Sequence, residues 1–144
     1  MKKKSLFNYL VLTLILLTGT FIIGVHETPA QDDVVVIVNN SKGSLSASQI
    51  KRIFTGDVTN WPDGGTVKVL LNSNAGVTEQ FCSKYLNTTP SKLDSSWVKK
   101  SIRDGTPTPR KVASNVIVTM VSNSPKFIGF VKRSEAGSSV KIID

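Results

Sequence analysis

The sequence predicts an α/β fold with a mostly parallel sheet of about four strands and flanking helices. Short apolar runs of strand composition alternate along the chain with segments of helical periodicity. The first run, residues 34–38 (VVVIV), is continuously apolar and β-branched, as in a strand buried on both faces. The chain has 144 residues and one cysteine, so the fold depends on an apolar core without an internal disulfide.

The first predicted helix follows a polar loop at residues 39–43. Ser46 and Gln49 have the spacing of a capping box at its start. Gly56 is suited to the left-handed conformation that ends many helices. Three apolar residues lie between them at helical spacing: Ile50, Ile53 and Phe54.

The second predicted strand covers residues 67–71 (VKVLL), after a turn-forming loop. The polar, glycine-containing stretch 72–76 comes next. Residues 77–86 are then expected to be helical, and Thr89-Pro90 starts another helix that ends near Gly105.

The remaining elements complete the α/β alternation. Residues 106–110 are predicted to be a proline-bearing loop, and Ser114 is expected to cap the last long helix. Residues 127–131 (FIGFV) and 140–143 (VKII) are the last two predicted strands.

The first 30 residues resemble a secretory signal. Three lysines precede an almost wholly apolar stretch, residues 6–25, and Thr28-Pro29-Ala30 loosely fits a cleavage site. The stretch is also long enough to remain as an uncleaved membrane anchor. We therefore expect a domain at 31–144 exported to the periplasm or cell envelope. No cysteine lies near Ala30, so a lipoprotein is not expected.

Residues 31–144 carry a moderate positive charge, with 15 Lys and Arg against 9 Asp and Glu. This balance favours anionic partners such as small oxyanions, acidic glycans or a membrane surface, although a solvated basic surface explains it equally well. Nucleic acid is not an expected partner, because the basic residues are spread out and the chain is exported.

An enzyme is not predicted. The only histidine, His26, lies at the edge of the export segment, so a triad with histidine is excluded from the remaining domain. The carboxylates have no metal-ligand spacing, and no cofactor motif is present. Cys82 is expected to be a buried thiol, with an intermolecular disulfide as the alternative. Trp61 and Trp97 either stack a ligand or, more commonly, pack in the core.

A candidate ligand site follows from the loops after the first two strands, since ligands of open α/β sheets lie beyond the carboxyl ends of strands. The second loop leads into a helix, whose first amides can hold an anion. Simple helix capping is the alternative interpretation. The predicted ligand-binding residues are Asn40, Ser41, Asn72, Ser73, Asn74, Gly76, Val77 and Thr78.

Two segments give the chain a family resemblance. Residues 53–61 (IFTGDVTNW) resemble the IFxGxxxxW segment of phosphate-type substrate-binding proteins of ABC transporters, and residues 127–131 resemble their PGAIGYV strand. The resemblance implies the type 2 periplasmic-binding-protein fold. That fold has two lobes, and this chain is similar to short members with only the second lobe.

The resemblance also implies a phosphate site, with departures. In the family, an arginine and a Gly-Ser-Gly-Thr turn bind phosphate. In this chain Asn72 replaces the arginine, and residues 75–78 (AGVT) occupy the position of the turn. A two-pronged, charge-assisted hydrogen bond is thereby lost. A homodimer, a membrane transporter or a protein supplying the missing lobe is the implied partner. The alternative is a ligand-free interaction module of the cell envelope.

Overall fold

A computed structural model describes residues 32–144. The predicted export segment and its cleavage site near Ala30 lie outside these residues. Within the described part of the chain, no helix is long and apolar enough to cross a membrane.

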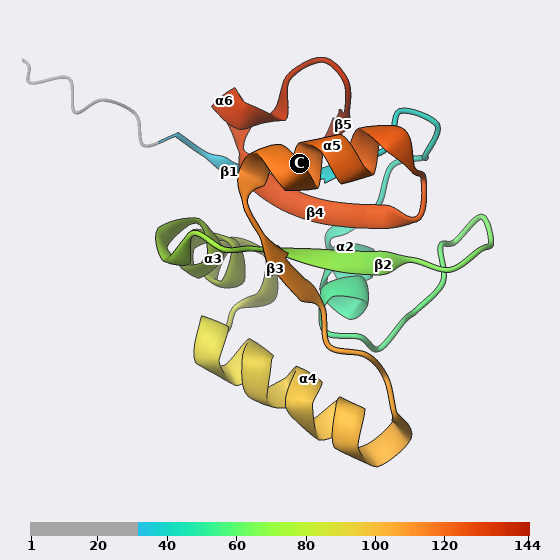
Figure 1. The fold of residues 1–144 in the computed structure, drawn as a ribbon, viewed down its shortest axis with the longest axis vertical. Coiled ribbons are helices and arrows are strands. Elements are labelled where there is room, and N and C mark those ends of the chain that lie inside the picture. The colour runs from blue at the N-terminus through green and yellow to red at the C-terminus, as the bar shows by residue number, and fades with distance from the viewer. Residues whose placement is uncertain (1–31) are drawn as a thin grey trace, which may run out of the picture. The chain divides into compact units, whose positions relative to one another are not determined.

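The sheet contains five strands in the order β3-β2-β4-β1-β5 (Figure 1). β2 is parallel to β3 and to β4, whereas β1 is antiparallel to both of its neighbours. Four strands therefore run in one direction, which confirms a mostly parallel sheet, and β1 runs against them. The strands are β1 Val34–Val38, β2 Lys68–Asn72, β3 Arg110–Val112, β4 Phe127–Lys132 and β5 Lys141–Ile143.

The helices begin close to the predicted positions. Ser46 and Gln49 form the expected capping box. The helix expected from Val77 begins at Ala75, and Ser114 is the first residue of its helix rather than its cap. The helical elements are α2 Ala47–Phe54, α3 Ala75–Phe81, the π-helix η1 Cys82–Leu86, α4 Pro90–Asp104, α5 Ser114–Asn123 and α6 Arg133–Ala136.

Two short elements were not predicted. β3 lies where the proline-bearing loop was expected to end, and α6 follows β4 directly. β3 has only three residues, none of them fully buried, so it lacks the apolar run that marks the other strands. Tertiary pairing with β2 stabilises it instead.

Apolar side chains fill both faces of the sheet. One face packs against α2, α3, η1 and α4, and the other packs against α5 and α6 (Figure 1). The rings of Phe81 and Phe130 stack with centroids 3.9 Å apart in the first core. Trp97 is buried and its indole donates to the Phe54 carbonyl at 2.9 Å, while Trp61 is also buried. The core-packing interpretation of both tryptophans is confirmed.

The reversed direction of β1 decides which loops share an edge. Val34 pairs with Lys132, and Val38 pairs with Ile128. The start of β1 therefore lies beside the end of β4, at the edge where β2 and β3 also end. We call this the carboxyl edge, and the opposite one, where β2, β3 and β4 begin, the amino edge.

Candidate functional site

The structure separates the two predicted ligand loops. The loop with Asn40 and Ser41 follows β1 at the amino edge, whereas residues 72–78 lie at the carboxyl edge. A five-residue strand, about 16 Å long, separates them. The prediction that both loops form one site is wrong, because it assumed that β1 and β2 run in the same direction.

Asn40 and Ser41 have structural partners. The Asn40 carboxamide donates to the Ser139 carbonyl at 3.3 Å. The amide and hydroxyl of Ser41 both donate to Asn39 Oδ1, at 3.0 and 2.8 Å. These bonds hold the loop between β1 and α2 in a tight turn. Asn40 and Ser41 are therefore removed from the candidate site.

The other six predicted residues are brought together where β2 joins α3. Asn74 is the N-cap of α3, and its Oδ1 accepts from the amides of Gly76 and Val77 at 3.0 and 3.2 Å. The Thr78 amide donates to the Asn74 carbonyl at 3.0 Å. Two amides of the helix start thus converge on one side-chain oxygen, as in an ordinary cap.

Asn72 organises the inner side of this junction. It is only 3% exposed, and its carboxamide nitrogen donates to Ser114 Oγ at 2.9 Å and to the Phe130 carbonyl at 3.3 Å. Its Oδ1 accepts from the Asn74 amide at 2.9 Å. The Asn72 side chain thus links β2, β4, α5 and the α3 cap.

The remaining donors of the junction are also used internally. The Ser73 amide donates to the Val112 carbonyl at 2.9 Å, and the Thr78 hydroxyl donates to the Asn72 carbonyl at 2.8 Å. Among the amides of residues 73–78, that of Ala75 has no acceptor within residues 32–144. In this conformation, an oxyanion would have to displace the Asn74 side chain to reach more than one amide.

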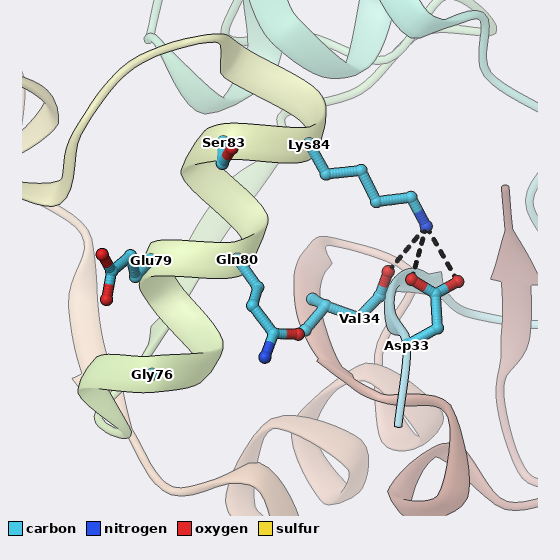
Figure 2. Close-up of a pocket in the computed structure, with 7 residues that line it drawn as sticks. All are labelled: Asp33, Val34, Gly76, Glu79, Gln80, Ser83 and Lys84. Carbon is cyan, nitrogen blue, oxygen red and sulfur yellow. Dashed lines mark hydrogen bonds and ion pairs between the residues drawn. The ribbon is translucent and has the colours of Figure 1, made fainter. Parts of the chain in front are cut away.

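A groove of about 600 Å³ opens beside the junction, between the outer face of α3 and η1 and the start of β1 (Figure 2). Lys84 Nζ bonds to both Asp33 carboxylate oxygens, at 3.0 and 2.9 Å, and to the Val34 carbonyl at 3.0 Å. The hydrogen bond from Lys84 is the main cause that lowers the pKa of Asp33. The lining residues are Asp33, Val34, Gly76, Glu79, Gln80, Ser83 and Lys84.

The charge of this groove does not favour an anion. Two carboxylates, Asp33 and Glu79, line it against the single ammonium of Lys84, which Asp33 already neutralises. The sequence did not indicate that Asp33 lies near this site. A β1 strand parallel to β2 would have placed Asp33 at the amino edge. At this junction, the helix start is therefore a better place for an oxyanion than the groove.

Two further observations limit the chemistry that the described residues can carry out. Within residues 32–144, no group of three or more histidine, cysteine or carboxylate side chains is placed to hold a metal. Cys82 is fully buried in η1, and burial is the main cause that raises its pKa to about 11. The thiol therefore stays protonated and inert, as the buried-thiol interpretation predicted.

The architecture is that of a PBP-like fold, as comparison with known proteins shows. The chain belongs to the PBP superfamily: the model of a PBP superfamily domain matches residues 20–140. No curated protein matches the chain significantly. The resemblance found in the sequence is confirmed at the level of the family.

Three solved structures share the fold. An ABC-type phosphate transport receptor from Vibrio cholerae is 20% identical with a TM-score of 0.51, over 78% of this chain and 46% of that chain. A structure with bound phosphate from Clostridium perfringens, described as a phosphate ABC transporter substrate-binding protein, is 21% identical with a TM-score of 0.59, over 78% and 44%. PstS from Borrelia burgdorferi is 16% identical with a TM-score of 0.57, over 78% and 47%. The chain thus spans slightly less than half the length of each.

Proposed function

We propose that this protein is an exported solute-binding-type protein that holds phosphate or another small oxyanion at the β2–α3 junction, in connection with ABC-type transport. The names of the three structural neighbours support phosphate as the first ligand to test. The proposal includes no catalytic activity, cofactor or metal.

One observation carries the proposal: two amides at a helix start converge on a single oxygen atom. Asn74 Oδ1 lies 3.0 Å from the Gly76 nitrogen and 3.2 Å from the Val77 nitrogen. A phosphate oxygen accepts the same bonds and adds negative charge near the positive end of the helix dipole. If the Asn74 side chain rotates away, these two amides and that of Ala75 become donors for the anion.

The expected affinity of the isolated lobe is low. The anion competes with an acceptor that is already attached to the chain, and the family's arginine is replaced by the fully bonded Asn72. A single lobe also leaves the ligand exposed to water, where hydrogen bonds gain little net free energy. We expect a dissociation constant on the order of millimolar.

Equilibrium dialysis with labelled phosphate tests the proposal. The Asn74→Ala variant removes the competing oxygen and should bind phosphate more tightly than the unmodified protein. Asn40→Ala, at the amino edge, is the matched control and should bind as the unmodified protein does. If neither the unmodified protein nor folded Asn74→Ala takes up phosphate saturably at millimolar concentration, the proposal fails.

A partner that supplies the second lobe is part of the same proposal. A second copy of this chain, or another protein, would supply a second lobe that closes over the junction and excludes water. Sedimentation velocity with and without phosphate tests the homodimer: a phosphate-dependent shift to the dimer mass supports it. A monomer at all concentrations would leave a different protein as the partner.

A ligand-free interaction module of the cell envelope is the second candidate. The internal acceptors of the Ser73, Asn74, Gly76, Val77 and Thr78 amides favour it, because a capped helix start needs no ligand. This candidate predicts a stable protein partner in an envelope fraction together with no phosphate uptake by either the unmodified protein or Asn74→Ala.

Export is tested separately from ligand binding. Intact mass measurement of the protein recovered from its native envelope should give a chain that begins at Gln31 if the segment is cleaved near Ala30. A mass that includes Met1–Ala30, found in the membrane fraction, would indicate an uncleaved anchor.

A further inference from the structure

A second cavity lies at the amino edge, away from the β2–α3 junction. It has a volume of about 500 Å³, within the range of small-molecule sites. Its walls come from the start of β2, the loop before β2, α4 and the segment 106–109. Most of its lining is apolar, including Val58, Val67, Val69, Trp97, Pro107 and Phe127.

The cavity lies beside the part of β2 that β3 does not cover. β3 pairs with β2 only from Arg110, which lies opposite Leu70, while Lys68 and Val69 pair with β4 alone. The chain therefore leaves the sheet before β3, and the space between it and β2 remains open.

The charged residues of the cavity all carry one sign. Lys68 and Arg110 line it, both are exposed, and no carboxylate is among the lining residues. Neither cation forms an ion pair within residues 32–144. The cavity thus combines apolar walls with two cations that lack a counter-charge.

We propose that this cavity binds a small amphipathic anion, a medium-chain carboxylate with its tail against the apolar walls and its carboxylate beside Lys68 and Arg110. Charge complementarity selects this class. A neutral apolar molecule gains no attraction from the two hydrated cations, and an inorganic anion leaves the apolar walls in contact with water. Thr59, Thr66 and Thr108 among the lining residues offer further hydroxyl donors, whereas the Thr106 hydroxyl already donates to Asp104.

Isothermal titration calorimetry with decanoate below its micelle concentration tests the site. Saturable binding at one site per chain is expected. Decanol, which lacks the charge, should bind about ten-fold more weakly, because the charge-assisted contacts are lost. Acetate, which lacks the tail, should show no saturable binding.

The variants Lys68→Gln and Arg110→Gln should each weaken decanoate binding several-fold and leave decanol binding unchanged. Lys126→Gln is the matched control, since Lys126 lies just before β4 and does not line the cavity. Thermal unfolding of each variant shows that it is folded. Three outcomes of the titrations would overturn the proposal: no saturable uptake of decanoate, equal affinity for decanoate and decanol, or an equal loss of decanoate affinity with Lys126→Gln. Binding of the protein to anionic vesicles without uptake of monomeric decanoate would also overturn it.

Discussion

The hydroxyl of Thr78 donates a 2.8 Å hydrogen bond to the carbonyl oxygen of Asn72, inside the turn that joins β2 to α3. Both residues are buried, with 8% and 3% of their surface exposed. The Thr78 hydroxyl, predicted from the sequence as a ligand donor, is therefore a support for the turn. It fixes the helix start on which the proposed anion site depends.

Thr78→Val should destabilise the protein. Valine keeps the shape but leaves the buried Asn72 carbonyl without this donor, which costs about 1–3 kcal/mol. Urea unfolding measures the loss. Thr119→Val is the control, since Thr119 is exposed on α5 and its hydroxyl bonds only within its own helix. This substitution should change the free energy of unfolding by less than about 0.5 kcal/mol. Equal effects of the two variants would contradict a structural role for Thr78.

Gly129→Ala should also destabilise the protein, through overpacking. A Cβ at Gly129, in the middle of β4, would collide with the Ile117 Cγ2 methyl and lie 3.6 Å from Leu70 Cβ. We expect a loss of about 1–3 kcal/mol in urea unfolding. Gly43→Ala is the matched control, because nothing lies within 4 Å of its added Cβ.

A second variant identifies the colliding partner. Ile117→Ala removes the Cγ2 methyl, so the double variant Gly129→Ala/Ile117→Ala should lose less stability than the sum of the single variants. Strict additivity would show that the Gly129 effect has another source.

Cys82 should not react with iodoacetamide in the native protein at pH 8. Burial in η1 raises the pKa of the thiol to about 11, so little thiolate exists and reagent has no access. Mass spectrometry should show labelling only in denaturant. Rapid labelling under native conditions would indicate that η1 opens readily.

The stability contributed by Asp33 should depend on pH and salt. The pKa of Asp33 in the folded state is lowered, chiefly by the hydrogen bond from Lys84. The stability that Asp33 contributes is therefore present above its unfolded pKa near 3.8 and is lost as the pH falls through its pKa in the folded state. Asp33→Asn should therefore be slightly less stable than the unmodified protein at pH 7 and equally stable in strong acid. The pair is half exposed, so salt should reduce the difference at pH 7. A difference that persists in acid would contradict this origin.

The sequence was sufficient for features with local causes. The Ser46–Gln49 capping box and the left-handed Gly56, with a φ of 74°, were both predicted, because the chemistry of each lies within a few residues. The buried strand 34–38 was equally clear from its apolar run.

Features set by strand direction could not be predicted in this way. VVVIV has the same composition in a parallel and an antiparallel strand, so nothing local indicated that β1 opposes β2. That reversal moved Asn40 and Ser41 to the amino edge and brought Asp33 to the carboxyl edge. Likewise, the internal acceptors of the Gly76 and Val77 amides became visible only with the position of the Asn74 side chain.

The backbone amide resonances of Gly76 and Val77 test the anion site most directly. In ¹⁵N-labelled Asn74→Ala, phosphate should shift both resonances saturably, while the Asn40 and Ser41 amides at the other edge stay unmoved. The unmodified protein should show the same shifts at higher phosphate concentration, since Asn74 Oδ1 competes there. If the Gly76 and Val77 resonances do not move in either protein, or move no more than amides across the whole domain, no oxyanion binds at the start of α3.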